Sequence, residues 1–207
     1  MHAPSRLIIV SNRGPYIEKL VRGKRKRVRA AGGLVTALDP VLRKRGGVWV
    51  STEEQLSGRA GGATELAQRA SVPGETLEPE DYRIVEVPLA RAIQSGYYDG
   101  VSNAVLWPLL HSFPPTIRVG KAPWANYVQV NHAFAERVVD CSNSSDLIWV
   151  HDFHLMLVPA LIRERRDKVK IGWFCHVPWP GPDLFGILPW REDILEGLLG
   201  ADVLAFH

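Results

Sequence analysis

The strongest hydrophobic pattern in the chain lies between residues 145 and 185. Two apolar runs rich in β-branched and aromatic residues, at 147–150 and 171–175, predict buried strands. Between them, apolar residues at helical spacing followed by four charged residues predict a helix over residues 155–166. Apolar strands that alternate with a helix are typical of a parallel sheet covered on both faces.

The same alternation continues through the rest of the chain. Further strands are predicted at residues 6–10, 48–50, 82–88 and 200–207, the last of them buried. Further helices are predicted over residues 34–45, 102–106, 124–139 and 194–199. Residues 16–30 predict a hairpin that turns at Arg22 and Gly23. The pattern therefore predicts an α/β fold, a Rossmann-like parallel sheet with helices on both faces.

Polar residues come directly after the two central strands. His151, Asp152 and His154 follow the first strand, and His176 follows the second. Ligands of open parallel sheets bind just outside the carboxyl ends of the strands. Two adjacent strands therefore bring a carboxylate and up to three imidazoles to one edge of the sheet. This coincidence favours a functional site over loop residues that only satisfy one another.

The N-terminal part adds features that suit an anionic ligand. Gly32 and Gly33 open a predicted helix, where bare amide groups and the helix dipole favour phosphate, although many glycine pairs are only tight turns. Arg13 lies in the turn after the first strand. Trp49, on a predicted strand, is either a ligand contact or a core residue. The GxGxxG fingerprint of dinucleotide-binding proteins is absent.

The net charge of +3 comes from one segment. Six of the 25 basic residues lie at positions 22–29. The other 19 basic residues are outnumbered by the 22 acidic residues of the chain. No aromatic residue lies between Tyr16 and Trp49, whereas nucleic-acid binders spread their charge and interleave aromatic residues. We expect no nucleic-acid partner. The basic segment is either a solvated loop or a flap over an anionic ligand.

Composition and cysteine content place the chain among ordinary globular proteins, with 46% hydrophobic and 23% charged residues. No stretch approaches the roughly 20 apolar residues that span a bilayer, and no signal-peptide core is present. The spacing of Cys141 and Cys175 matches no metal motif. We expect a cytoplasmic protein with reduced thiols, no metal and no membrane partner.

Five motifs, in order along nearly the whole chain, resemble those of the trehalose-6-phosphate synthase family. They are SNRGPY at 11–16, GGL at 32–34, YYDGVSNAVLWPLLHSFP at 97–114, WVHDFHL at 149–155 and the run from FCHVPWPG to the end at 174–207. The resemblance implies the N-terminal domain of a retaining GT-B glycosyltransferase. It implies that residues 1–207 are a truncated acceptor-binding domain, that the C-terminal nucleotide-sugar domain is absent, and that the isolated chain is inactive.

The resemblance also implies an activity and a set of site residues. The activity is transfer of glucose from UDP-glucose to glucose 6-phosphate with retention, by front-face attack, giving trehalose 6-phosphate without a metal or other cofactor. By motif, the catalytic residues are Arg13, Asp152 and His176. The acceptor-binding residues are Arg13, Tyr98, Trp107 and Asp152, and the donor-binding residues are Gly32, Gly33 and His176.

Two alternatives remain. A glucosylglycerol-phosphate synthase runs the same reaction on another acceptor and has similar stretches around LLHSFP and ILPWRE, although SNR and VSNAVLWP favour the trehalose branch. A catalytically silent regulatory homologue is expected to lose pocket residues, and these are present. The sequence leaves open the donor nucleotide (UDP, ADP or GDP), the acceptor beyond a small phosphorylated sugar or polyol, and whether the protein is a homo-oligomer.

Overall fold

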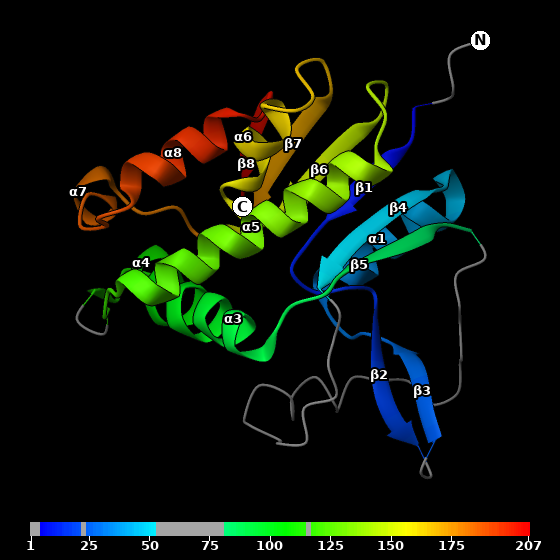
Figure 1. Ribbon diagram of the computed structural model, residues 1–207, viewed down its shortest axis with the longest axis horizontal. Coiled ribbons are helices and arrows are strands. Elements are labelled where there is room, and N and C mark those ends of the chain that lie inside the picture. The colour runs from blue at the N-terminus through cyan, green and yellow to red at the C-terminus, as the bar shows by residue number, and fades with distance from the viewer. Residues whose placement is uncertain (1–4, 22–23, 53–80, 115–116) are drawn as a thin grey trace.

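A six-stranded parallel sheet forms the centre of the computed structural model, which describes residues 5–21, 24–52, 81–114 and 117–207 (Figure 1). The strand order is β5-β4-β1-β6-β7-β8. The strands are β1 (Leu7–Val10), β4 (Gly47–Thr52), β5 (Arg83–Val87), β6 (Leu147–His151), β7 (Lys170–Cys175) and β8 (Val203–Phe206). The predicted α/β fold with a parallel sheet is confirmed.

Strand β1 shows why the sheet is covered on both faces. Successive side chains of a strand point to opposite faces. Ile8 and Val10 belong to the larger core cluster, whereas Leu7 and Ile9 belong to a second cluster with helix α1 (Gly33–Arg45). All four side chains are buried, as the continuous apolar run predicts.

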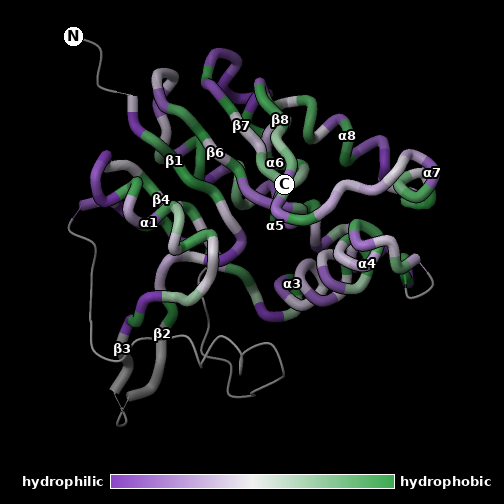
Figure 2. Tube along the Cα trace, turned by 180° about the vertical axis from the view of Figure 1, so that it is seen from behind, coloured by the Kyte–Doolittle hydropathy of each residue, from purple (hydrophilic) through white to green (hydrophobic). Residues whose placement is uncertain are grey.

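Helices cover the two faces of the sheet unequally. Helix α5 (Lys121–Cys141) crosses the front of the sheet diagonally, and α1 lies behind it (Figure 1). Helices α6 (Val158–Arg163) and α8 (Arg191–Leu199) continue the layer of α5 over β6 and β7. The shorter elements are α3 (Arg91–Ser95), η1 (Gly96–Leu106), α4 (Trp107–Leu110), η3 (Phe153–Leu155) and α7 (Pro182–Phe185). From behind, the central strands are the most continuous hydrophobic segments (Figure 2).

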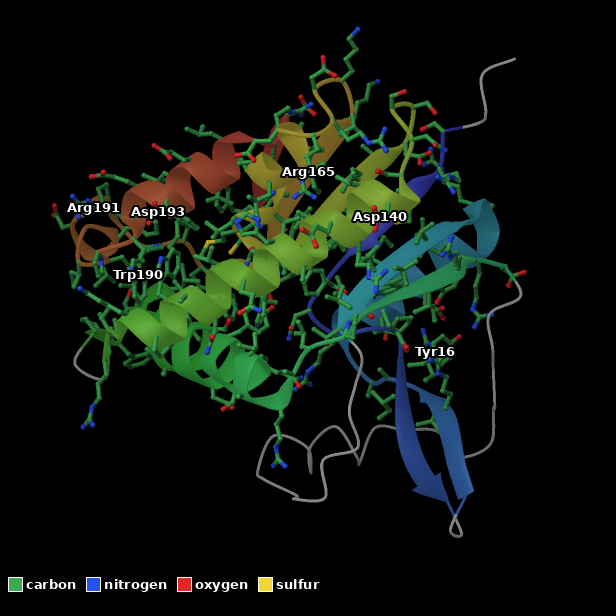
Figure 3. The ribbon with its side chains drawn as sticks, in the orientation of Figure 1. Tyr16, Asp140, Arg165, Trp190, Arg191 and Asp193 are labelled. Carbon is green, nitrogen blue, oxygen red and sulfur yellow. The ribbon has the colours of Figure 1, made fainter. Side chains whose placement is uncertain are left out.

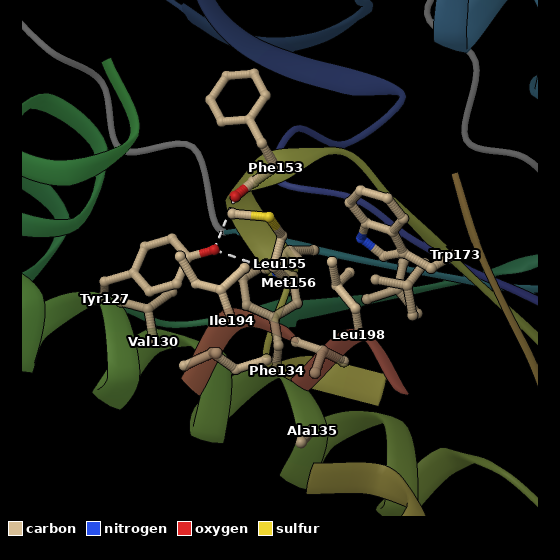
Figure 4. Close-up of a cluster of buried hydrophobic side chains, with 14 of the residues drawn as sticks. Tyr127, Val130, Phe134, Ala135, Phe153, Leu155, Met156, Trp173, Ile194 and Leu198 are labelled. Carbon is tan, nitrogen blue, oxygen red and sulfur yellow. Dashed lines mark hydrogen bonds between the residues drawn. The ribbon is translucent and has the colours of Figure 1, made fainter. Parts of the chain in front are cut away.

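Helix α5 fixes the segment that follows β6. The hydroxyl of Tyr127 donates a hydrogen bond to the carbonyl oxygen of Phe153 (2.7 Å) and accepts one from the amide of Met156 (3.2 Å), within an apolar cluster (Figure 4). One helical turn on, Asn131 Nδ2 donates to the carbonyl oxygen of His154 (3.2 Å). Because these polar groups are buried, each lost bond leaves an unsatisfied group, which makes the segment stiff.

An aromatic stack joins the same N-terminal part of α5 to α8. Trp190, just before α8, stacks on Trp124 of α5 with ring centroids 4.4 Å apart and planes 4° from parallel. Figure 3 places Trp190 on the side of α8 that faces α5. The contact holds the C-terminal helix against the layer that covers the sheet.

The hairpin predicted over residues 16–30 is confirmed. Strands β2 (Tyr16–Val21) and β3 (Lys24–Arg29) pair antiparallel, and the turn at residues 22–23 lies outside the described part of the chain. At the base of the hairpin, labelled by Tyr16 in Figure 3, the Tyr16 hydroxyl accepts a hydrogen bond from Arg43 (2.6 Å). Arg27 forms an ion pair with Glu86 of β5 (2.6 Å). The hairpin is therefore joined to β5 of the sheet through Arg27 and to helix α1 through Tyr16.

Two sequence predictions need correction. The helix predicted over residues 155–166 is shorter, because residues 153–155 form a 3-10 turn and α6 ends at Arg163. Strand β8 is not buried: Val203 and Phe206 are 61% and 46% exposed. It stands at the end of the strand order and pairs with β7 alone among the described strands. No helix within the described ranges is long and apolar enough to cross a membrane.

Candidate active site

Five residues form a continuous series of contacts beyond the carboxyl ends of β1, β6 and β7. Arg13 Nη2 donates a hydrogen bond to the Tyr98 hydroxyl (3.1 Å). The Tyr98 ring stacks on His154 at 5.7 Å, and His154 Nδ1 lies 3.8 Å from Asp152 Oδ2. Asp152 Oδ1 in turn accepts a hydrogen bond from the amide of His176 (3.4 Å). The predicted residues Arg13, Tyr98, Asp152 and His176 are thus brought together.

The loop that carries Arg13 is braced from below. The buried indole of Trp49 donates to Ser11 Oγ (2.8 Å), and this hydroxyl donates to the carbonyl oxygen of Arg13 (2.7 Å). Asn12 Oδ1 accepts a hydrogen bond from the Tyr97 hydroxyl (2.9 Å). Trp49 is therefore a core residue that supports the site through Ser11, which resolves the alternative left open by the sequence.

Tyr98 lies on a π-helix, η1. π-Helices are rare in proteins, and those that occur are often found at functional sites. Close packing against α5 holds η1 in place. A Cβ atom on Gly96 would lie 2.0 Å from Asn126 Nδ2, and one on Gly100 would lie 2.9 Å from Pro123 Cβ. The two glycines let the π-helix approach α5, and this contact aims Tyr98 at Arg13.

Asp152 has a backbone conformation that is otherwise almost restricted to glycine, with φ 75° and ψ 168°. Its amide donates to the carbonyl oxygen of Phe174 on β7 (2.7 Å), which holds the residue in this conformation. Burial raises the pKa of the Asp152 carboxyl group, against opposing contributions from a backbone amide and from the imidazoles of His176 and His111. Such strain is typical of residues whose geometry serves a ligand.

Burial favours the uncharged form of three imidazoles of the site, those of His151, His154 and His176. Burial lowers the pKa of His151 to about 3, with His176 adding to the effect, and lowers the pKa of His154 to about 3, with Arg13 adding to it. Burial also lowers the pKa of His176, which Asp152 opposes. These rings therefore act as neutral donors or acceptors, and Arg13 supplies the permanent positive charge at this edge.

Trp107 lies at the margin of the site with 44% of its surface exposed. Its ring stacks on His111 at 4.2 Å, and His111 Nδ1 donates to the carbonyl oxygen of Trp107 (2.7 Å). His111 is close enough to Asp152 to influence its pKa. The stack with His111 thus holds in place an indole that remains partly exposed to solvent.

The predicted glycine pair is not joined to this cluster by contacts of the described residues. Helix α1 begins at Gly33 without a side-chain cap, and Gly32 has φ 152°. A Cβ atom on either glycine would meet nothing within 4 Å. No described residue fills the space beside these two glycines at the start of α1, where helix amides favour an anion. Their binding of the donor stays a prediction.

Three residues that the sequence did not single out belong to the site. Asn12 and Tyr97 connect the Arg13 loop to η1, and His111 fixes Trp107. His111 stands four residues after Trp107, a spacing that brings two side chains together on a helix. Asn12 and Tyr97 carry no such local signal, because 85 residues separate them.

The model of glycosyltransferase family 20 matches residues 5–207. A trehalose-6-phosphate synthase of Mycolicibacterium gilvum (strain PYR-GCK) is 38% identical over 206 residues, which are 99% of this chain and 39% of that protein. The corresponding enzyme of Mycolicibacterium smegmatis (strain ATCC 700084 / mc(2)155) is 40% identical over 204 residues, covering 98% of this chain and 38% of that one. The chain thus spans about two fifths of the length of the curated relatives it matches.

Solved structures agree with this likeness. An α,α-trehalose-phosphate synthase (UDP-forming) from Burkholderia xenovorans in complex with glucose-6-phosphate has a TM-score of 0.75 at 29% identity, covering 97% of this chain and 40% of that chain. A trehalose-6-phosphate enzyme from E. coli bound with UDP-2-fluoro glucose has a TM-score of 0.74 at 30% identity, covering 97% and 39%.

Proposed function

Because the chain belongs to glycosyltransferase family 20, we propose that it is the acceptor-binding part of an α,α-trehalose-phosphate synthase. The reaction is transfer of glucose from UDP-glucose to glucose 6-phosphate with retention, giving trehalose 6-phosphate. The observation that carries the proposal is the contact series from Arg13 through Tyr98 and His154 to Asp152 and His176. It joins a fixed cation, a carboxylate and neutral imidazoles at one edge of the sheet.

Arg13 is suited to bind phosphate. Its guanidinium group is exposed and uses Nη2 for the Tyr98 hydroxyl, and within the described ranges its other donors have no hydrogen-bond partner. A dianionic acceptor and a diphosphate leaving group both favour a permanently charged, planar donor. We assign the phosphate of glucose 6-phosphate to Arg13 and Tyr98, with Arg13 also near the donor diphosphate.

The hydroxyl groups of the acceptor sugar are assigned to Asp152, and its ring face to Trp107. The Asp152 carboxylate lies between His154 and the amide of His176. The exposed indole of Trp107 stacks on the ring of His111. His176, at the end of β7, is assigned to the donor glucose. The open amides of Gly32 and Gly33 are assigned to the donor.

Positioning and charge stabilisation carry the proposed chemistry. The bond from the anomeric carbon to the diphosphate breaks while the acceptor oxygen attacks the same face, and the acceptor proton passes to the departing phosphate oxygen. Asp152 then orients the acceptor and forms no covalent intermediate. The proposed mechanism assigns part of the charge of the leaving group to Arg13 and uses no metal ion.

We further propose that residues 1–207 alone bind the acceptor weakly and transfer nothing. The relatives carry about three fifths of their length outside the region matched here. Without a second wall over the site, the diphosphate stays hydrated and its developing charge is uncompensated.

The test is a transfer assay on the full-length protein, with UDP-glucose as donor and glucose 6-phosphate or glycerol 3-phosphate as acceptor. We expect trehalose 6-phosphate and UDP in equal amounts, with glucose 6-phosphate strongly preferred. Preference for glycerol 3-phosphate would instead establish the glucosylglycerol branch. Absence of transfer to either acceptor would favour a regulatory homologue. Calorimetric titration of residues 1–207 with glucose 6-phosphate tests acceptor binding separately.

A further inference from the structure

Two imidazoles meet at the edge of the sheet where β6 and β7 end. His151 is the last residue of β6, and His176 is the first residue after β7. His151 Nδ1 and His176 Nε2 lie 3.0 Å apart, with ring planes 25° from parallel. The side-chain period of two places both rings, with Trp149 and Phe174, on one face of the sheet.

The environment of His151 is dry and apolar on its remaining sides. The residue is only 1% exposed. Its ring packs against Trp149 at 4.8 Å and Phe174 at 6.4 Å. His151 Nε2 is buried and has no hydrogen-bond partner in the described part of the chain. Among the described residues, the His151 ring therefore forms its hydrogen bond with His176.

The position of the shared proton follows from which unpartnered atom of His151 costs less free energy when buried, an N–H group or a bare nitrogen. A neutral imidazole carries one N–H and one bare nitrogen. If His176 donated from Nε2, His151 would accept at Nδ1 and keep its own hydrogen on Nε2, as a buried donor without an acceptor. In the opposite arrangement, the unpartnered atom of His151 is a bare nitrogen. Orphaned buried N–H groups are the rarer and costlier case.

We infer that His151 is a positioning residue: its Nδ1–H donates to Nε2 of His176 and thereby holds His176 in the tautomer protonated at Nδ1. This inference rests on the proposed function for its consequence. With Nε2 occupied, His176 offers substrate an N–H donor, which recognises a hydroxyl or phosphate oxygen of the donor sugar. His151 fixes both the ring orientation and the polarity of that group, as the partners of functional histidines do.

The tautomer is observed directly in the 207-residue protein labelled with ¹⁵N-histidine. Long-range ¹H–¹⁵N correlation spectra distinguish a protonated Nδ1 from a protonated Nε2, and the His176→Gln variant assigns the signals. We expect His176 in the Nδ1–H form at neutral pH. An Nε2–H signal for His176 in the parent protein would overturn the inference without any variant and without any turnover.

Variants at His151 test whether its hydrogen bond determines the tautomer of His176. His151→Phe keeps a ring but removes the donor, so His176 should shift toward the Nε2–H form. In His151→Gln, the side-chain amide N–H takes over as donor and the Nδ1–H form should return. The control Trp149→Phe alters the packing around His151 and should leave the tautomer unchanged. An unchanged tautomer in His151→Phe would contradict the assignment.

Kinetics give the second readout. In the full-length enzyme, His151→Phe should lower kcat by about tenfold to hundredfold with the KM for glucose 6-phosphate little changed, and His151→Gln should recover part of the loss. A role in folding alone would lower the amount of active enzyme without this split between the two replacements. Failure of the transfer assay would refute the proposed function and leave the tautomer measurement intact.

Discussion

Arg13 Nη2 donates a hydrogen bond to the hydroxyl oxygen of Tyr98, 3.1 Å away, although 85 residues separate the two. The guanidinium group also lies over the tyrosine ring, 5.8 Å from its centroid. The contact joins the loop after β1 to the π-helix η1 across the edge of the sheet. It places the cation without occupying all of its donors, which is what an incoming phosphate needs.

We expect Arg13→Ala to lower kcat as well as raise the KM for glucose 6-phosphate, with a combined loss of at least a hundredfold in kcat/KM. The charge at the leaving phosphate grows as the bond breaks, so the interaction strengthens in the transition state. Arg13→Lys should recover only part, because an ammonium group lacks the fork. Steady-state kinetics in the full-length enzyme measure both effects.

Two comparisons make this assignment specific. Tyr98→Phe removes one partner of the cation and should cost about tenfold in kcat/KM. Arg137→Ala, on the exposed surface of α5, should change neither constant. If Arg137→Ala lowers activity as much as Arg13→Ala, the effect is one of net charge and the phosphate assignment fails.

Asp152→Asn separates an orienting carboxylate from a nucleophile. The variant keeps the shape and one acceptor oxygen but loses charge-assisted hydrogen bonds worth roughly 1.5–3 kcal/mol, a factor of about ten to a hundred. We expect this loss mainly as a higher KM for glucose 6-phosphate. Loss of nearly all turnover at unchanged KM, or a glucosyl ester on Asp152 seen by mass spectrometry, would show that the residue is a nucleophile.

The backbone of Asp152 makes a separate prediction about stability. At φ 75° and ψ 168°, a side chain costs of order 1–3 kcal/mol that glycine avoids. Asp152→Gly should therefore be more stable than Asp152→Ala by about 1 kcal/mol, the reverse of the order in an ordinary element. Urea unfolding of both variants measures the difference. Higher stability of the alanine variant would mean that the residue has another conformation in solution.

The sequence predicts the elements whose signal is local. The apolar runs of β1, β6 and β7 and the periodicity of α5 identify the sheet and its main cover, and the polar residues after β6 and β7 mark the edge that carries the site. These patterns depend on neighbouring residues alone, so one sequence suffices to read them.

What the sequence does not predict depends on contacts between distant segments. The close approach of η1 to α5 at Gly96 and Gly100, and the contacts of Tyr98 with Arg13 and His154, join segments that are far apart in the chain. The exposure of β8 depends on which elements pack against that strand. An apolar run of four residues does not show whether such elements are present. The roles of Tyr98 and Trp107 came from family resemblance and not from periodicity.

The close contact between α6 and α8 predicts a strong effect at Gly200. A Cβ atom there would lie 2.3 Å from the backbone Cα and N atoms of Ala160, which cannot move aside as a side chain can. Gly200→Ala should lower the free energy of unfolding by about 1–3 kcal/mol. Gly181→Ala is the control, since a Cβ atom there meets nothing within 4 Å and should change stability by less than about 0.5 kcal/mol. Equal effects in urea unfolding would contradict this packing.

Two buried histidines make the stability of the fold depend on pH. Burial lowers the pKa of His151 and of His154 to about 3 in the folded protein, whereas a histidine in an unfolded chain has a pKa of about 6.5. Between these values the unfolded chain binds more protons than the folded protein. The free energy of unfolding therefore falls as the pH falls below about 6.5, and it continues to fall down to about pH 3.

We expect each of these histidines to contribute a slope of about 1.4 kcal/mol per pH unit between roughly pH 4.5 and 5.5, where aspartates with lowered pKa values are still ionised. His154→Phe should remove about one such slope from urea-unfolding free energies measured across this range. His132→Phe, on the exposed surface of α5, is the matched histidine-to-phenylalanine control. If His154→Phe keeps the full slope, His154 is protonated in the folded protein, and the neutral donors and acceptors assigned to this site are wrong.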